Sequence, residues 1–217
     1  MTDWIAIGLT ILGAYLLGSI PSAVWIGKLF YGVDVRTKGS GNAGTTNVLR
    51  VLGAKAAIPV FAIDLLKGYG AVALAAYSSL LPDTPEYLYL KMGLCLMAAL
   101  GHMFPVFAGF RGGKGVATLV GAMFAFSVGG ICLALATFVV IVSFSHYVSV
   151  GSMVGGLLLP FYAALCGDSD PRLMAFFGFI SLLLFYTHRS NIGRLLHGTE
   201  NKTYLFGRSK DKAERES

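Results

Sequence analysis

Long apolar segments alternate with short polar segments along this chain. Seven apolar segments are candidates for membrane spans, because a helix needs about 20 apolar residues to cross the hydrocarbon core of a bilayer. They cover residues 4–26, 56–81, 87–106, 116–128, 131–144, 155–166 and 173–187. We therefore predict an all-α integral membrane protein with about seven transmembrane helices, some of them short or tilted. Residues 1–217 would form a single polytopic membrane domain.

Interruptions in this pattern predict bends, turns and close contacts. Pro21 should free the carbonyl group four residues earlier and bend the first helix. Gly129 and Gly130 separate the short fourth and fifth segments, and we interpret them as the tight turn of a hairpin. Gly151 and Gly155 have a spacing that favours close helix contact. A signal peptide is the alternative for the first segment, but no basic residue precedes its apolar run.

Composition supports a place in the bilayer. Hydrophobic residues make up 55% of the chain and charged residues only 13%, with a mean hydropathy of +0.70. Soluble domains carry about 25% charged residues. The cysteines lie far apart in apolar segments, so we expect small core residues rather than a disulfide framework or a zinc site. They are Cys95, Cys132 and Cys166.

The net charge of +6 is distributed unevenly among the polar segments. One predicted membrane face would hold nearly all of the basic residues. The other face would hold only two basic residues, Lys91 and Arg172, together with several acidic residues. The positive-inside rule then places the N-terminus outside and the C-terminus in the cytoplasm. Residues 188–217 would form a basic cytoplasmic tail, and every polar motif would lie on the cytoplasmic side.

The polar segment at residues 39–50 has a composition typical of a phosphate site. Its glycines let the backbone approach a ligand closely, and successive N–H groups in such a run can bind an anion. Hydroxyl and amide side chains add donors, and Arg50 adds a forked cation that suits phosphate. A plain glycine-rich turn between helices is the alternative. The residues concerned are Gly39, Ser40, Gly41, Asn42, Gly44, Thr45, Thr46, Asn47 and Arg50.

Three further polar segments should reach the same membrane face. One surrounds a cation with glycines but lacks a GxxxxGK[ST] register, so it is not a nucleotide-binding P-loop. It consists of Gly112, Gly113, Lys114 and Gly115. The others are residues 145–152 and 188–201. Taken alone, Lys114 is explained as a basic anchor at the membrane surface, and His188 as a residue that favours the negative, C-terminal end of a helix dipole. Together the four segments favour an anion site.

Ionisable residues within spans have two interpretations. Asp64 and Lys67 lie three residues apart on one helical face, where they can form an ion pair. Such a pair inside a membrane is either functional or a clamp between helices, and the sequence leaves both open. We interpret His102 and His146 as hydrogen-bonded packing residues rather than catalysts.

Five motifs carry a specific resemblance over almost the whole chain. In order they are GSGNAGTTNVLR at 39–50, DLLKG at 64–68, GHMFPVF at 101–107, GGKGVAT at 112–118 and HRSNIGRLLHGTE at 188–200. Together they resemble the bacterial acyl-phosphate:glycerol-3-phosphate acyltransferases, the PlsY family. The resemblance implies an enzyme of the bacterial inner membrane that acts in phospholipid biosynthesis. It would move a fatty acyl group from acyl phosphate to the sn-1 hydroxyl of glycerol 3-phosphate, giving lysophosphatidic acid and phosphate.

The resemblance also implies roles for the polar residues. Residues 40–47 would hold acyl phosphate. The residues with catalytic roles would be Ser40, Arg50, Lys114, His188 and Asn191. The wider substrate-binding set would be Gly39, Gly41, Asn42, Gly44, Thr45, Thr46, Asn47, Gly112, Gly113, Gly115, Ser149, Ser152 and Glu200. Ser152 would help to hold glycerol 3-phosphate, with Ser149 as the competing serine. Either His188 or a substrate phosphate oxygen would accept the proton.

Other classes of protein are disfavoured. Acyltransferases that pair a histidine with an aspartate five positions later do not fit, because no histidine here has that partner. A transporter of a phosphorylated solute is the main alternative function. It would favour an internal repeat and charges near the bilayer midplane, but the sequence has no repeat. We expect no metal ion, no cofactor and no nucleic-acid partner, and a monomer in the bilayer.

Overall fold

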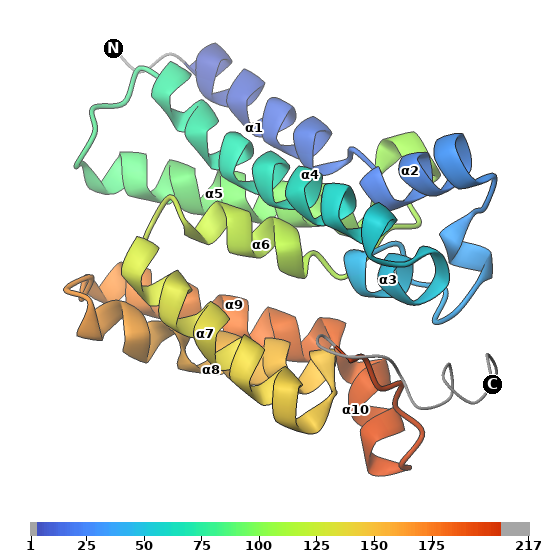
Figure 1. The fold of residues 1–217 in the computed structure, drawn as a ribbon. Helices are drawn as coiled ribbons and strands as arrows, with labels where there is room; N and C mark the ends of the chain where they lie inside the picture. Colours follow the sequence, from blue (N-terminus) through green and yellow to red (C-terminus); the bar gives the residue numbers. More distant parts are fainter. Residues whose placement is uncertain (1–3, 205–217) are drawn as a thin grey trace, which may run out of the picture. The chain divides into compact units, whose positions relative to one another are not determined.

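The computed structural model describes residues 4–204, and within them every regular element is a helix. The chain divides into two compact units, residues 1–128 and residues 129–217. Figure 1 shows the fold, with the long helices of each unit running side by side. The predicted all-α class is confirmed for the described part of the chain. The assignment of residues 1–217 to a single polytopic domain stays a prediction.

The first unit packs its long helices around a core of alanine and leucine side chains. The α-helices are α1 (Trp4–Gly18), α2 (Ser22–Tyr31), α3 (Thr45–Leu52), α4 (Ala54–Ala73), α5 (Pro85–Met103) and α6 (Val116–Met123). Three 3-10 helices join them: η1 (Val35–Thr37), η2 (Leu74–Tyr77) and η3 (Val106–Ala108). Helices α1, α4 and α5 pack against one another, and α6 packs on α4. Their core contains Ala14, Ala71, Ala75, Leu90, Leu94 and Ala98.

Glycines set the distance between α4 and α6. A Cβ atom at Gly68 would lie 1.9 Å from the carbonyl oxygen of Thr118, and one at Gly121 would lie 1.9 Å from that of Leu65. The two helices therefore approach each other backbone to backbone, as small residues allow in membrane proteins. This contact fixes α6, and with it the polar segment that precedes α6, to a long helix.

The break between α1 and α2 confirms the predicted bend. Pro21 immediately precedes α2, and the two helices are bent by 41°. The backbone N–H of Ile20 donates to the carbonyl oxygen of Leu17 at 3.2 Å. A tighter turn therefore satisfies the carbonyl group that the proline cannot reach.

Helix α6 follows α5 for only part of its length. It starts near His102, whose Nδ1 atom lies 3.1 Å from the hydroxyl oxygen of Thr118. The turn after α6 ends near Lys91, whose ammonium group donates to the carbonyl oxygen of Ala125. Eight residues of helix are about 12 Å long, whereas the hydrocarbon core of a bilayer is about 30 Å thick. This short helix is the reason why the fourth predicted span is difficult to define.

The second unit contains α7 (Val128–Ser145), α8 (Val148–Leu165), α9 (Pro171–Thr187) and α10 (Arg189–Leu196). A Cβ atom at Gly151 would lie 2.7 Å from Cγ2 of Val142, and one at Gly155 would lie 2.9 Å from the carbonyl oxygen of Ala134. The predicted close contact at these two glycines is therefore confirmed, and their partner is α7.

Two sequence predictions in this part of the chain are wrong. Gly129 and Gly130 do not form a turn, because both lie within α7 and the turn precedes them at residues 124–127. A Cβ atom at Gly129 would lie 2.7 Å from the sulfur atom of Cys166, so this glycine serves a helix contact. Cys95 is buried as expected, but Cys132 and Cys166 are exposed.

Four helical segments of the described residues are long and apolar enough to cross a membrane, or up to six if each bent helix pair is one span. The four are Ala54–Tyr77, Pro85–Ala108, Val128–Ser145 and Val148–Leu165. The pairs are α1 with α2, and α9 with α10, which are bent by 57°. This agrees with an integral membrane protein; the predicted number of about seven also counts α6.

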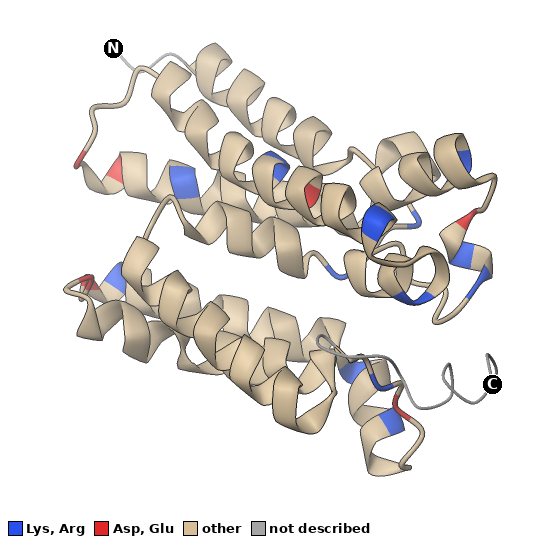
Figure 2. Cartoon of the chain, viewed as in Figure 1, with Lys and Arg blue, Asp and Glu red and all other residues tan. Residues whose placement is uncertain are grey.

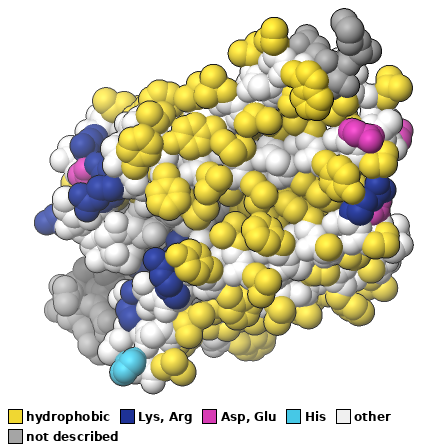
Figure 3. All heavy atoms as spheres, turned by 180° about the vertical axis from the view of Figure 1, so that it is seen from behind, with side chains coloured by type: hydrophobic (Ala, Val, Ile, Leu, Met, Phe, Trp, Pro, Cys, Tyr) yellow, Lys and Arg dark blue, Asp and Glu magenta, His cyan; other side chains and the backbone are white. Residues whose placement is uncertain are grey.

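The surface has the character expected of helices in lipid. Figure 3 shows apolar side chains covering most of the face in view, and exposed large residues include Leu29, Phe30, Phe144 and Leu182. Figure 2 shows that most of the basic residues of the first unit lie at the end that carries α3. Within this unit, the predicted charge asymmetry is therefore present.

Candidate active site

Asn47 holds the first polar segment in shape. Its amide nitrogen donates to the carbonyl oxygens of Val35 at 2.8 Å and Lys38 at 3.1 Å, and its oxygen accepts from the backbone N–H of Ser40 at 2.8 Å. Gly39 has a φ of +58°, and a Cβ atom there would lie 2.4 Å from Oδ1 of Asn47. Asn47 therefore supplies partners to backbone groups that have none in regular structure. These hydrogen bonds of the buried Asn47 side chain stabilise the conformation of the loop.

The same loop leads directly into the N-terminus of α3. Gly44 is the N-cap residue and no side chain caps the helix. The first N–H groups of a helix lack intrahelical acceptors, and the positive end of its dipole attracts anions. Thr45 Oγ1 is buried and has no hydrogen-bond partner within the described residues. The exposed or half-buried residues of this loop are Gly39, Ser40, Gly41, Asn42, Gly44, Thr45 and Thr46.

The second polar segment packs against the first. The backbone N–H groups of Gly112 and Gly113 donate to the carbonyl oxygens of Met103 and His102, each at 3.2 Å. A Cβ atom at Gly113 would lie 2.4 Å from Nε2 of His102 and 3.0 Å from the carbonyl oxygen of Ala43. The structure therefore brings two of the four predicted segments together. Within the first unit these two segments adjoin each other at Gly113 and Ala43.

Two cations lie beside these loops. Arg50 is in the last turn of α3, and Lys114 lies two residues before α6; both are half-buried. Gly115, between Lys114 and α6, has a φ of +79° and so adopts a left-handed conformation that favours glycine. The segment thus turns sharply into the N-terminus of α6.

Asp64 and Lys67 form the predicted ion pair, at 2.8 Å between Oδ1 and Nζ. Asp64 also accepts a hydrogen bond from Ser22 at 2.7 Å, and Lys67 donates to the carbonyl oxygen of Ile20 at 2.7 Å. These contacts join α4 to the break between α1 and α2. They support the interpretation as a clamp between helices. His102 is buried beside this cluster, with its Nδ1 atom 3.6 Å from Oδ1 of Asp64.

Glu200 organises the polar residues of the second unit. Its Oε1 atom accepts from Asn191 at 2.6 Å and from Ser149 at 3.1 Å, and its Oε2 atom accepts from Arg194 at 2.7 Å. Burial raises the pKa of Glu200, but these three hydrogen bonds outweigh it, so the pKa lies below its ordinary value. The third and fourth predicted segments therefore also adjoin each other. Whether all four segments converge stays a prediction.

His188 lies at the junction of α9 and α10 and is buried. Its Nδ1 atom lies 2.8 Å from the carbonyl oxygen of Leu184. A carbonyl oxygen only accepts, so Nδ1 carries the hydrogen, and Nε2 is the acceptor in the neutral ring. The structure thus fixes which nitrogen of His188 serves as a base or, when protonated, as a second donor.

The two candidate serines differ in their partners. Ser149 donates to Glu200, whereas Ser152 donates to the carbonyl oxygen of Val148 at 2.9 Å, within its own helix. Both side chains are buried. Each hydroxyl oxygen keeps the capacity to accept a further hydrogen bond, so the choice between them stays open.

A shared design links these segments. Helices α3, α6 and α10 are each eight residues long; α6 begins directly after a predicted polar segment, whereas α3 and α10 begin within one. Each segment therefore contributes the positive end of a helix as well as side chains. Within residues 4–204, no three His, Cys, Asp or Glu side chains gather as a metal site would require.

Sequence reasoning gave no role to Asp34 and Arg36. Arg36 donates to Asp34 from Nε at 3.0 Å and from Nη2 at 2.8 Å, just before the first loop. The sequence contains one indication of this ion pair: Asp34 and Arg36 are two positions apart and shortly precede the glycine-rich segment at residues 39–50.

Comparison with known proteins gives these features a family. The model of the glycerol-3-phosphate acyltransferase family matches residues 8–198. This chain belongs to the glycerol-3-phosphate acyltransferase family. Among its curated members, that of Desulfotalea psychrophila is 45% identical over 190 residues, covering 86% of this chain and 93% of that protein. That of Geobacillus kaustophilus is 44% identical over 194 residues, covering 89% and 94%.

Solved structures of the family agree with the fold. The crystal structure of PlsY (YgiH), an integral membrane glycerol 3-phosphate acyltransferase, in its glycerol 3-phosphate form has a TM-score of 0.81 and 38% identity. It covers 93% of this chain and 96% of that one. The lysophosphatidic acid form has a TM-score of 0.79 and 37% identity, covering 93% and 95%. The resemblance found in the sequence motifs is thereby confirmed.

Proposed function

We propose that this family member transfers a fatty acyl group from acyl phosphate to the sn-1 hydroxyl of glycerol 3-phosphate. The products are lysophosphatidic acid and phosphate. The observation that carries this proposal is the pair of adjoining glycine-rich loops in the first unit, each of which opens a short helix. Two phosphate-bearing substrates require two anion sites, and the adjoining loops supply two helix N-termini, those of α3 and α6.

The chemistry demands positioning more than a strong nucleophile. Acyl phosphate is a mixed anhydride and is already activated. Attack by the sn-1 hydroxyl oxygen forms the new ester bond as the bond between the acyl carbon and the phosphate oxygen breaks, and the hydroxyl proton leaves. Alignment of the two substrates and stabilisation of the developing charge are the main contributions open to the protein.

Residues of the first unit take both phosphates in this proposal. The loop at residues 39–47 holds acyl phosphate through backbone N–H groups and the hydroxyl groups of Ser40, Thr45 and Thr46. The buried Thr45 hydroxyl supports this role, because a buried donor without a partner costs about 1–3 kcal/mol unless a ligand satisfies it. Arg50 and Lys114 hold the phosphate of glycerol 3-phosphate through charge-assisted hydrogen bonds.

Residues of the second unit orient glycerol 3-phosphate. His188 and Asn191 act as ligands, with Ser152 or Ser149, and Glu200 holds Asn191 and Ser149 in place. A substrate phosphate oxygen accepts the proton in this scheme, and His188 is the alternative acceptor. We place the enzyme in the bacterial inner membrane as a monomer, with its N-terminus outside and its C-terminus in the cytoplasm.

One reconstitution tests the function. Purified protein in lipid nanodiscs, given palmitoyl phosphate and labelled glycerol 3-phosphate without coenzyme A, should yield labelled lysophosphatidic acid. Palmitoyl coenzyme A and palmitoyl-acyl carrier protein are tested as alternative acyl donors in parallel reactions. Product formed only from one of these donors would refute the acyl-phosphate part of the proposal, and absence of product from all three would refute acyl transfer.

A further inference from the structure

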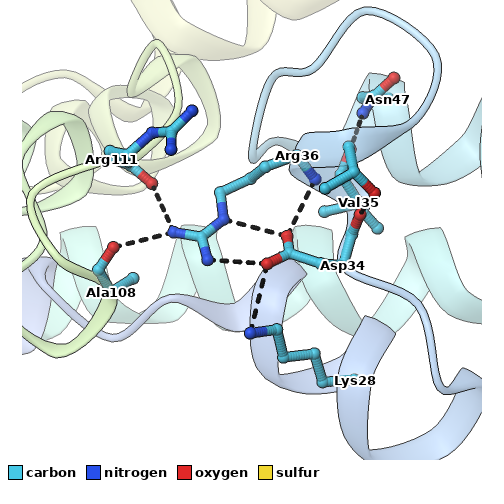
Figure 4. A network of polar contacts seen from close by, with 8 residues as sticks. Lys28, Asp34, Val35, Arg36, Asn47, Ala108 and Arg111 are labelled. Atoms are coloured by element: carbon cyan, nitrogen blue, oxygen red, sulfur yellow. Dashed lines mark hydrogen bonds and ion pairs between the residues drawn. The ribbon is translucent and has the colours of Figure 1, made fainter.

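The side chain of Arg36 connects the two polar loops of the first unit. Its Nη1 atom donates to the carbonyl oxygens of Ala108 at 2.8 Å and Arg111 at 3.4 Å (Figure 4). Both acceptors belong to the segment that leads into Gly112 and Gly113. On its other edge the guanidinium binds Asp34, and the backbone N–H of Arg36 donates to Asp34 Oδ1 at 3.0 Å.

The same residue is tied to the first loop. Asp34 and Arg36 flank Val35, which is fully buried and whose carbonyl oxygen accepts a hydrogen bond from Asn47 (Figure 4). A Cβ atom at Gly41 would lie 3.4 Å from the carbonyl oxygen of Arg36, so the loop turns back over this residue. Arg36 thus contacts one loop through its backbone and the other through its side chain.

The geometry explains why an arginine occupies this position. A guanidinium presents donors along two edges of a rigid plane, and here one edge pairs with a carboxylate while Nη1 on the other side reaches two carbonyl groups. The Arg36 side chain is 18% exposed and that of Asp34 is 20% exposed. Hydrogen bonds from Arg36 hold the pKa of Asp34 well below its usual range, so the pair stays ionised. Lysine offers a single point charge and cannot reproduce both sets of contacts.

We propose that Arg36 is a positioning residue that sets the separation between the two phosphate-binding loops. It touches neither substrate and acts through the backbone at Ala108 and Arg111. The inference rests on the proposed function, which assigns acyl phosphate to the first loop and the phosphate of glycerol 3-phosphate to Arg50 and to Lys114 of the second loop. Loss of the contact should then misalign two bound substrates rather than weaken the binding of one. A misplacement of about 1 Å can cost about 10²-fold in rate.

The principal variant is Arg36→Gln, compared with Arg36→Lys and with Lys28→Gln as a matched control. Lys28 makes a more exposed ion pair with the same Asp34 carboxylate, at 3.2 Å and with 53% of its side chain exposed. Its loss leaves every contact of Arg36 in place. Exposed ion pairs contribute little, so Lys28→Gln should keep kcat within about twofold of the wild-type value.

Steady-state kinetics distinguish positioning from binding. With palmitoyl phosphate and glycerol 3-phosphate both saturating, kcat of Arg36→Gln should fall about 10- to 100-fold, the loss expected for charge-assisted hydrogen bonds. Each KM should change by less than about threefold, as for an interaction that does not bind the ground state. Arg36→Lys should recover little of the rate. Wild-type kcat in either variant, or a loss confined to the KM of one substrate, would overturn the proposal.

Amide hydrogen exchange tests the contact without any substrate. In Arg36→Gln, peptides over residues 38–44 and 106–113 should both exchange at least about tenfold faster, while peptides from α4 and α5 keep their protection. Equal loss of protection in the long helices would indicate general destabilisation and would overturn the positioning role. If both loops exchange faster in Arg36→Gln but the wild-type protein forms no lysophosphatidic acid, the contact would be upheld and the proposed function refuted.

Discussion

Glu200 contributes to the site through the groups that it holds. Its buried carboxylate accepts hydrogen bonds from Ser149, Asn191 and Arg194. A carboxylate repels a phosphate placed beside it, so its contribution is the orientation of neighbouring donors. Asn47 has the same relation to the first loop. At the scale of single residues, Asn47 and Glu200 therefore hold in place, each within its own unit, residues that meet a ligand in the proposed scheme.

Arg50 and Lys114 belong to the residues that meet a ligand in this scheme. Arg50→Ala and Lys114→Ala should each remove a charge-assisted phosphate contact worth about 1.5–3 kcal/mol. The expected result is a loss of about 10- to 100-fold in kcat/KM for glycerol 3-phosphate, with a smaller effect on acyl phosphate. Initial rates with each substrate varied in turn provide the measurement. A larger effect on the acyl donor would mean that the two phosphate sites are exchanged.

The His188→Gln variant tests whether His188 binds glycerol 3-phosphate or accepts its proton. Glutamine keeps a polar side chain of similar reach but cannot accept the proton. If a substrate oxygen is the acceptor, KM for glycerol 3-phosphate should rise about 10- to 100-fold with kcat little changed. A fall of about 10²–10⁴-fold in kcat at unchanged KM would instead identify His188 as the base.

The pH profile of the same variant supplies a second measurement. Glu200 has a lowered pKa, so its stabilising contribution is present above the ordinary carboxylate range and is lost only as pH falls through the lowered value. An acidic limb between pH 5 and 8 therefore does not come from Glu200, whereas histidine ordinarily titrates there. Persistence of that limb in His188→Gln would exclude His188 as the titrating base.

Residue types and spacing identified the polar segments but not the division of roles within them. Ser40, Thr45 and Arg50 belong to a recognisable phosphate composition. The sequence does not show that the side-chain amide of Asn47 forms hydrogen bonds with three backbone groups, or that Arg36 contacts the second loop. These contacts depend on how distant segments pack.

At the scale of helices, the site depends on how short helices are braced by long ones. Helix α6 is held on α4 by backbone contact at Gly68 and Gly121. The long apolar helices were predictable from length and hydropathy alone. The turn at residues 124–127 was not predictable, because Gly129 and Gly130 lie within α7, where Gly129 serves a close contact with Cys166 rather than a turn.

Gly121→Ala should weaken the contact between α4 and α6. The added methyl group would lie 1.9 Å from the carbonyl oxygen of Leu65, so the helices must separate. Overpacking of this kind costs about 1–3 kcal/mol, and the thermal unfolding midpoint in detergent should fall. Gly70→Ala is the matched control, because a Cβ atom there meets nothing within 4 Å. Equal midpoints for the two variants would contradict a role for this contact.

Gly113→Ala should disturb the second loop for a reason internal to the protein. In the proposed site, a side chain at Gly113 would push phosphate away. The structure adds that a Cβ atom at Gly113 would collide with His102 and press on Ala43. Activity should be abolished while expression persists, as measured by product formation per mole of purified protein. Near-normal activity of the variant would show that Gly113 is an ordinary turn residue.

At the scale of the whole molecule, the number of times the chain crosses the bilayer depends on the bent helix pairs and on α6. Up to six spans are long enough, and α6 with its turn adds a short passage alongside α5. Counting that passage gives an odd number of crossings, which agrees with termini on opposite sides. The charge asymmetry of the first unit agrees with this arrangement, but hydropathy alone does not resolve a helix as short as α6.

Cysteine labelling of intact spheroplasts tests the topology. Asp83→Cys should react with a membrane-impermeant maleimide from outside, and Lys38→Cys only after permeabilisation. Lys210→Cys, in the tail beyond the described residues, should behave like Lys38→Cys. Cys132 and Cys166 are exposed and are replaced by serine beforehand. Labelling of all three introduced cysteines from the same side would contradict the predicted orientation.

Three short helices that begin at polar segments have a consequence for the conditions under which such a site operates. Peptide dipoles have no proton to lose, so the attraction that α3, α6 and α10 offer to an anion is the same in acidic and alkaline cytoplasm. Ions in solution can screen it, but no titration removes it. On the side of the protein, phosphate binding would therefore change with pH only through the side chains that surround the backbone groups. The remaining pH dependence would come from the phosphate itself, whose second proton is lost at about pH 6.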